Sequence, residues 1–187
     1  MAGLFRKLFR IGKLPAEMRP GVDSEGVIFL GEYLGVVMRF TGHVPGRRSV
    51  GLVRGYGGAL ALTNARVLAT VSAVPGKGGR AVDQPWNAPQ SGTVKGTLSE
   101  SGLLLEVADL SQVDPEFSGT LSLNFKAELP ADVLSRVPSR TLAFDVAPKF
   151  VYSVLGIPRG CATVPSWRCF YASCCASAGY PLNCGPK

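Results

Sequence analysis

The sequence has little with which to build a catalytic or metal site. Its 187 residues include a single histidine, His43, and no cysteine before Cys161. A histidine-based triad or metal site would need His43, which lies in the polar segment TGHVPGRR, where we expect a solvated loop residue. No Gly-x-Ser-x-Gly elbow, His-Glu-x-x-His pair or aspartate-rich calcium loop is present. We therefore expect no enzyme and no cofactor.

Long hydrophobic runs are also missing. The best of them, Val27–Leu30 and Tyr33–Met38, are interrupted by Glu32 and Arg39 long before the roughly 18 to 20 residues that a membrane helix needs. The first thirteen residues lack the uninterrupted apolar region of a secretory signal. Four cations interrupt them: Arg6, Lys7, Arg10 and Lys13. We expect a cytoplasmic protein that does not span a membrane.

Charge is sparse and of one dominant sign. Only 18% of the residues are charged, and 20 Lys and Arg against 13 Asp and Glu give a net charge of +7. Such a surplus suits an acidic partner, although a merely soluble basic surface would look the same. The 23 glycines and 14 prolines show no repeat, which favours many short strands joined by turns. At 46% hydrophobic content, the chain is long enough for one domain with its own core.

The N-terminal residues have the pattern of a short basic amphipathic helix. Apolar residues recur at helical spacing, with the cations on the other face: Leu4, Phe5, Leu8 and Phe9 against Arg6, Lys7, Arg10 and Lys13. Gly12 and Pro15 end the pattern. The sequence leaves two roles open: contact with an anionic membrane, or packing on the protein's own domain or a partner subunit.

Strand-like runs follow a loop around Pro20 and Gly21. They are Val27–Leu30, Tyr33–Phe40, Ser49–Arg54, Ala59–Thr63, Arg66–Ser72, Gly92–Leu98, Leu103–Val107 and Gly119–Lys126. Thr63 and Asn64 predict a tight hairpin turn. The proline- and glycine-rich stretch 74–90 predicts mostly loop, with a brief strand near residues 80–83. In the last run Leu121, Leu123 and Phe125 alternate with polar residues, which predicts one buried face.

The C-terminal third is harder to assign. Pro130 predicts the start of a short helix over residues 131–137. Two more apolar runs, Thr141–Val146 and Lys149–Leu155, are expected along the outside of the sheet, as either helix or strand. The five cysteines do not have zinc-finger spacing and are odd in number: Cys161, Cys169, Cys174, Cys175 and Cys184. We expect a poorly ordered tail of reduced thiols, with metal binding or redox pairing as the alternatives.

One segment suggests a family. ALALTNARVLATVS, at residues 59–72, and the later VDQPW resemble the middle of bacterial pleckstrin-homology-like domain proteins. The resemblance covers residues 26–137 and implies a bent barrel of about seven strands, closed at one end by a helix. It further implies a binding or assembly module rather than a catalyst. We therefore predict an all-β, or β-dominated α+β, fold.

The expected organisation has four parts. These are a basic helix and linker (1–25), the barrel (26–137), a C-terminal extension packing on it (138–160) and the cysteine-rich tail (161–187). Four cations are candidates for anion binding: Arg47 and Arg48 in a loop between two early strands, and Lys77 and Arg80 in the glycine-rich segment PGKGGR. Solvated edge charges and a flexible turn are the respective alternatives.

The expected function is non-catalytic binding or scaffolding, peripheral at the inner face of the membrane through the N-terminal helix. Its partner would be an anionic membrane surface or a protein, and a homo-oligomer stays open. A small hydrolase or transferase is the first alternative, using carboxylates among Asp83, Glu106, Asp109 and Asp114. A nucleic-acid-binding barrel is the second alternative, but such a barrel requires aromatic residues arranged with cations on one face of the sheet. Here they are scattered: Phe29, Tyr33, Phe40 and Tyr56.

Overall fold

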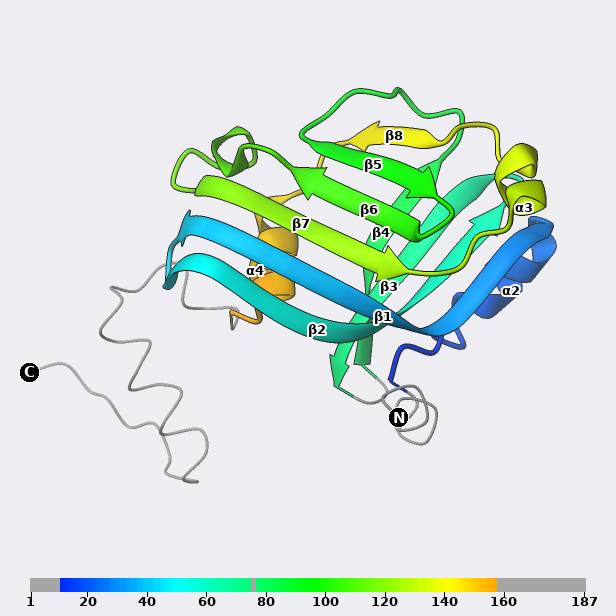
Figure 1. The fold of residues 1–187 in the computed structure, drawn as a ribbon, viewed down its shortest axis with the longest axis horizontal. Helices are drawn as coiled ribbons and strands as arrows, with labels where there is room; N and C mark the ends of the chain where they lie inside the picture. Colours follow the sequence, from blue (N-terminus) through cyan, green and yellow to red (C-terminus); the bar gives the residue numbers. More distant parts are fainter. Residues whose placement is uncertain (1–10, 75–76, 158–187) are drawn as a thin grey trace, which may run out of the picture.

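The computed structural model describes residues 11–74 and 77–157. Within these residues, eight strands form one antiparallel sheet that curls into a nearly closed barrel (Figure 1). The strand order is β4-β3-β2-β1-β7-β6-β5-β8. The strands are β1 Val27–Val44, β2 Arg47–Thr63, β3 Arg66–Val74, β4 Lys77–Pro85, β5 Val94–Ser99, β6 Gly102–Val107, β7 Ser118–Lys126 and β8 Thr141–Phe144. The predicted all-β fold class is confirmed.

Short helices lie between and after the strands. They are α2 Arg19–Ser24, the 3-10 turn η1 Leu110–Gln112, α3 Ala131–Arg136 and α4 Pro148–Leu155. The helix predicted after Pro130 is present as α3, with Pro130 as its N-cap. The loop expected around Pro20 and Gly21 is wrong, because these residues belong to α2. Proline in the first turn is compatible with a helix, since its missing N–H has no partner there.

The four strand runs predicted before Asn64 are two long strands. Val27–Leu30 and Tyr33–Phe40 both belong to β1, and Ser49–Arg54 and Ala59–Thr63 both belong to β2. The intervening glycines suggested turns, but within a sheet a glycine also marks a bulge or a close backbone approach. In β1 the register shifts between Gly31 and Leu34, where Tyr33 has a φ of 60°. This bulge bends the strand without ending it.

The long ribbon of β1 and β2 connects two halves of the sheet. β2 pairs with β3 over Gly57–Leu62, whereas β1 pairs with β7 over Gly35–His43. The halves therefore meet near the pair Gly35 and Gly57. At Gly58 a Cβ would lie 2.5 Å from the Thr70 carbonyl oxygen, so the close packing of the bend needs glycine there.

Alternation along β7 agrees with the sequence. Leu121, Leu123 and Phe125 are at most 2% exposed and join the main core, while the residues between them are not buried. The hairpin predicted at Thr63 and Asn64 joins β2 to β3. The inward-facing residues of the strands are apolar and together form the main core.

The predictions for three other segments are wrong. β8 does not pack along the outside of the sheet but extends it, pairing with β5. α4 lies in the main core, where Val151 and Leu155 are fully buried. The stretch from Lys77 to Pro85, expected to be mostly loop, is strand β4 paired with β3. Strand pairing satisfies backbone groups even where a glycine-rich sequence has little intrinsic preference for a strand.

The segment before β1 covers the outer face of one half-sheet. Leu14 and Val22 form a second small core with Ala59, Ala61 and Leu68. Two hydrogen bonds attach the segment to the bulge of β1: Leu14 N–H donates to Glu32 Oε1 at 3.1 Å, and Tyr33 N–H donates to the Gly12 carbonyl at 2.8 Å. The bulge therefore provides the partners for an otherwise irregular chain.

A polar network joins α2, the β2–β3 hairpin and β4. Arg66 forms ion pairs with Glu25 at 2.7 Å and with Asp83 at 2.9 Å. Thr63 Oγ1 donates to Glu25 Oε2 at 2.9 Å and accepts from Arg66 N–H at 3.0 Å. Trp86 Nε1 donates to the Thr63 carbonyl at 2.8 Å. One guanidinium thus links three segments that are far apart in the sequence.

We predict that Arg66→Ala lowers the free energy of unfolding by about 2 to 3 kcal/mol, since it leaves partly buried carboxylates without their cation. Chemical denaturation measures this. The matched control is Arg19→Ala, whose exposed ion pairs span 3.4 and 3.5 Å and should contribute no more than about 0.5 kcal/mol. Equal effects of the two substitutions would contradict the prediction.

The position of α4 gives a second stability prediction. Leu155→Ala should lower the free energy of unfolding by about 2 to 4 kcal/mol, because it opens a cavity in the core. Ser153→Ala on the exposed side of the same helix should change it by less than about 0.5 kcal/mol. If both variants unfold at the wild-type denaturant midpoint, α4 does not belong to the core.

Candidate functional site

One stretch of 50 residues, from Tyr33 to Val82, is free of negative charge. It contains no Asp or Glu, and it contains seven cations: Arg39, Arg47, Arg48, Arg54, Arg66, Lys77 and Arg80. This stretch therefore carries as much net positive charge as the whole protein, +7. It forms most of β1, all of β2 and β3, and the first part of β4. The overall composition does not reveal this concentration of positive charge. It becomes visible only when the charged residues are counted along the chain.

Two of these arginines hold the end of α4. Arg47 Nη1 and Arg54 Nη1 both donate to the Leu155 carbonyl, at 2.9 and 3.1 Å. Tyr56 Oη donates to the Val154 carbonyl at 2.7 Å. The last carbonyls of a helix have no partner within the helix and carry partial negative charge, which cations stabilise. Arg47, predicted as an anion-binding residue of a loop, instead lies in β2 and caps a helix.

The environment of this cap disfavours the charged form of Arg47. Burial, and then the nearby charge of Arg54, lower the pKa of Arg47. Both guanidinium groups meet carbonyl oxygens only, and no carboxylate forms an ion pair with either among the described residues. The cap thus places two like charges side by side.

Arg39 and Arg48 have a different environment. Both are exposed, and neither has a hydrogen bond or ion pair with another described residue. Arg48 was predicted in a loop, but it is the second residue of β2 and pairs with His43 of β1. His43, expected in a loop, is an exposed strand residue. Because strand side chains alternate between faces, Arg48 lies on the opposite side of β2 from Arg47.

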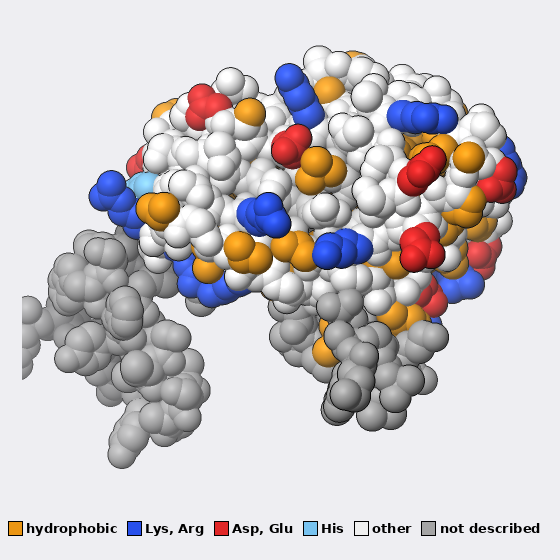
Figure 2. Space-filling model, viewed as in Figure 1, with side chains coloured by type: hydrophobic (Ala, Val, Ile, Leu, Met, Phe, Trp, Pro, Cys, Tyr) orange, Lys and Arg blue, Asp and Glu red, His pale blue; other side chains and the backbone are white. Residues whose placement is uncertain are grey.

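Apolar side chains are exposed beside these two arginines. Val50 is 90% exposed and Val53 is 59% exposed. Val53 lies directly across from Arg39 in the β1–β2 pairing. We call the outward-facing residues Arg39, His43, Arg48, Val50 and Val53 the basic face. Figure 2 shows Lys and Arg side chains spread over the visible side of the barrel, with hydrophobic side chains and some Asp or Glu side chains between them. Exposed apolar groups among unpaired cations are typical of an interaction surface.

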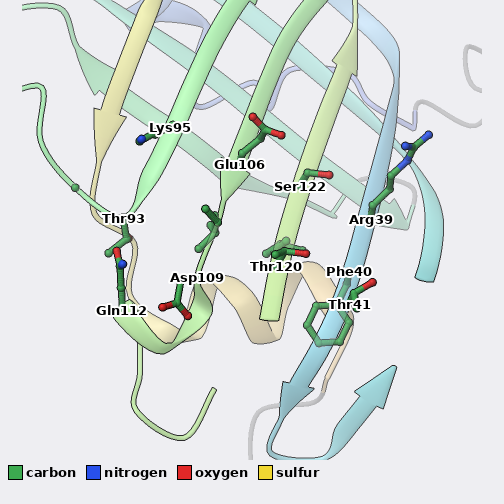
Figure 3. Close-up of a pocket in the computed structure, with 14 residues that line it drawn as sticks. Arg39, Phe40, Thr41, Thr93, Lys95, Glu106, Asp109, Gln112, Thr120 and Ser122 are labelled. Carbon is green, nitrogen blue, oxygen red and sulfur yellow. The ribbon is translucent and has the colours of Figure 1, made fainter. Parts of the chain in front are cut away.

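A shallow groove of about 710 Å³ lies next to the basic face, over β1, β7, β6 and β5. A row of polar side chains crosses it, one from each strand, in direct register: Lys95, Glu106, Ser122 and Arg39 (Figure 3). Glu106 forms no ion pair within 4 Å of a described cation. The groove is lined by both signs of charge, so it favours no single class of charged ligand.

Three of the four carboxylates considered for a hydrolase already bind protein donors. Asp83 pairs with Arg66, and Asp114 accepts from the backbone N–H of Glu116 at 3.0 Å. Asp109 accepts from the hydroxyl and the N–H of Ser111 at 2.8 and 3.0 Å. Those hydrogen bonds hold the pKa of Asp109 below its ordinary value. These carboxylates serve as turn and ion-pair partners.

The aromatic residues considered for nucleic-acid binding are not arrayed on one exposed face. Phe40 is 1% exposed within the main core. Tyr56 uses its hydroxyl on α4, and Phe29 packs against the core while partly buried. Base stacking needs accessible rings beside cations. This arrangement does not favour that alternative.

The remaining predicted site residues lie elsewhere in the chain, and some of them are outside the described residues. Lys77 and Arg80 lie in β4 rather than in a glycine-rich loop. Lys13 is exposed just before the segment that covers the sheet. The other N-terminal candidates lie outside the described residues: Leu4, Phe5, Arg6, Lys7, Leu8, Phe9 and Arg10. All five cysteines do as well. The predictions for these residues stay predictions.

Two further searches cover the described part of the chain. No group of three or more His, Cys, Asp or Glu side chains there could hold a metal ion. No helix there has the length and hydropathy to cross a membrane.

The local chemistry of Asp109 gives a prediction. Ser111→Ala should raise the pKa of Asp109, because it removes the hydroxyl that does most to lower it. Since the folded-state pKa is depressed, ionised Asp109 stabilises the fold above its unfolded pKa, and this contribution is lost as the pH falls through the folded-state pKa. A carbon-detected NMR titration of the carboxylate measures the shift. Ser135→Ala, which removes a hydroxyl bonded to the Asp132 carbonyl, is the control and should leave Asp109 unchanged; an identical Asp109 titration in S111A and wild type would contradict the assignment.

Comparison of the chain with protein-family models, with curated proteins and with solved structures finds no match. The resemblance to pleckstrin-homology-like domain proteins therefore stays a prediction.

Proposed function

We propose that the protein is a non-catalytic binding module that associates with an anionic membrane surface through the basic face. The observation that carries the proposal is the exposure of Val50 and Val53 beside Arg39 and Arg48, in a stretch of chain without any carboxylate. Anionic lipid offers both kinds of contact that this face needs: headgroup charge for the arginines and an apolar interior for the valines.

The N-terminal segment begins near the same side of the sheet. A Cβ on Gly57 would meet Ile11 at 2.6 Å, and one on Gly12 would meet the backbone of Gly58 at 2.5 Å. Gly57 faces outward, as does Val53 four residues earlier, because strand side chains alternate. The described chain therefore begins at Ile11 on the outward side of β2. The four apolar and three cationic side chains of residues 1–10 can extend the same contact.

The magnitudes indicate why two elements are needed. Each cation near an anionic leaflet contributes about 1 kcal/mol, and a fully buried valine contributes about 1.5 kcal/mol or more. The basic face alone would give a few kcal/mol, which is weak and reversible binding. Stable membrane association generally takes a second signal, and the N-terminal segment would supply it. Anionic lipids are concentrated in the cytoplasmic leaflet, which supports a location at the inner face of the membrane.

The contacts of the acidic and aromatic residues support binding over the two alternatives. The hydrolase hypothesis needs carboxylates that are free to exchange protons with a substrate, and Asp83, Asp109 and Asp114 are engaged elsewhere. The nucleic-acid hypothesis needs exposed rings, and Phe40 is buried.

Vesicle sedimentation tests the proposal. The full chain should pellet with phosphatidylcholine vesicles that contain phosphatidylserine and not with phosphatidylcholine alone. Replacing Arg39 and Arg48 together by Glu should weaken binding about 30-fold or more, because two attractive charges are lost. The matched control, R136E with R140E, makes the same change in charge at exposed positions in and after α3 and should stay within about threefold of wild type.

Equal losses in the two double variants would mean that net charge alone causes binding and would refute the role of the basic face. Binding to neutral vesicles as strong as to anionic ones would refute the proposal as well. Removal of residues 1–10 should weaken binding in the same direction as R39E with R48E.

A further inference from the structure

One long strand edge has no partner in the described part of the chain. From Arg47 to Tyr56, β2 pairs only with β1, since its pairing with β3 begins at Gly57. No other backbone hydrogen bond joins this stretch to a described segment. Figure 1 shows β2 at the lower border of the sheet over this part of its length, with β3 and β4 diverging behind it. The stretch therefore presents a row of backbone donors and acceptors.

This edge lacks two of the features that usually block strand addition, shortness and proline, although Arg47 and Arg54 face inward and the pairing with β1 shifts register between Phe40 and Gly42. Edge strands are typically short, or carry proline or inward-facing charge. Here the open stretch spans ten residues without a proline, and its outward side chains include the exposed Val50 and Val53. A Cβ on Gly51 or Gly55 would meet nothing within 4 Å, so the space beside these residues is open.

Arginines flank the edge on both faces of the sheet. Arg48 is exposed on the outer face, and Arg47 and Arg54 lie on the inner face beside α4. Arg47 and Arg54 each give one nitrogen, Nη1, to the Leu155 carbonyl, and a guanidinium has five N–H groups in total. Their remaining donors and their mutual repulsion favour a carboxylate at this position.

We propose that the edge of β2 from Arg47 to Tyr56 accepts an extended acidic segment of a partner protein by strand addition. Backbone hydrogen bonds would supply affinity, and alternate side chains of the incoming strand would supply specificity. Its acidic residues would pair with Arg48 on the outer face and with Arg47 and Arg54 on the inner face, and an apolar residue would lie beside Val53. A second copy of this chain is a poor occupant, since it would bring arginines against arginines.

This inference goes beyond the proposed function. It concerns the edge of β2 rather than its outer face, and it holds whether or not the protein binds lipid. Lipid and the partner strand would share Arg48 and Val53, so the two ligands are expected to compete for these residues.

Hydrogen exchange of the full chain, followed by mass spectrometry, tests the inference with two synthetic peptides. One is a ten-residue valine peptide with glutamates placed to face Arg47, Arg48 and Arg54, and the other has lysine in place of glutamate. At nine times its dissociation constant, the acidic peptide should slow exchange about tenfold at edge amides within residues 47–56. Amides of β5 and β6, on the far side of the sheet, serve as the internal control and should be unaffected. The lysine peptide should give no protection.

A charge variant provides a second measurement. Arg48→Glu should weaken binding of the acidic peptide about tenfold. The reason is that an attractive charge pair across two neighbouring strands, partly buried once the peptide binds, becomes repulsive. Arg140→Glu is the matched control and should leave the affinity unchanged. The variant changes an exposed residue, so folding is not expected to suffer, and the wild-type exchange measurement does not depend on it.

Three outcomes would overturn the inference. They are no protection by the acidic peptide, equal protection by both peptides, and protection of residues 47–56 that depends on protein concentration alone. The third would indicate a second copy. Failure of vesicle binding with retained peptide protection would instead refute the membrane proposal and leave this inference intact.

Discussion

The long pairing of β1 with β2 is the constraint on which the rest of the structure depends. Both strands pass from one half of the sheet into the other, so the curvature of the barrel is set where they bend. Glycines at 57 and 58 allow the bend, since Ile11 and the Thr70 carbonyl lie where their Cβ atoms would be. Beyond the bend, β2 leaves β3, and this divergence creates both the open edge and the outward-facing surface beside it.

Arginines from one acid-free stretch have three different roles because of where the fold places them. Arg66 meets two carboxylates from segments outside the stretch and becomes a structural link. Arg47 and Arg54 meet carbonyls at the end of a helix. Arg39 and Arg48 meet no described partner and face solvent. The same side chain thus stabilises the fold, caps a helix or stays free for a ligand, according to which elements the topology brings near it.

α4 connects the C-terminal part of the described chain to β2. Its apolar side enters the main core, while its last carbonyls hold Arg47, Arg54 and Tyr56 from below β2. The cap fixes which way these three side chains point, and it does so without adding negative side chains. The open edge of β2 is therefore supported on one face by a helix and yet remains positively charged, which suits both a strand partner and a lipid surface.

Local patterns determined much of the fold. Period-two alternation fixed the buried face of β7, Asn64 marked the β2–β3 turn, and Pro130 marked the start of α3, because each of these depends on backbone and side-chain properties of neighbouring residues. Tertiary structure alone decided what depends on distant partners: Gly31 and Gly55 lie inside strands because pairing overrides their local preference, and β4 is a strand because β3 lies beside it. The sequence determined that positive charge is concentrated before Asp83. Only the fold decided that Arg47 binds a helix end while Arg48 has no partner among the described residues, since adjacent residues of a strand face opposite sides of a sheet.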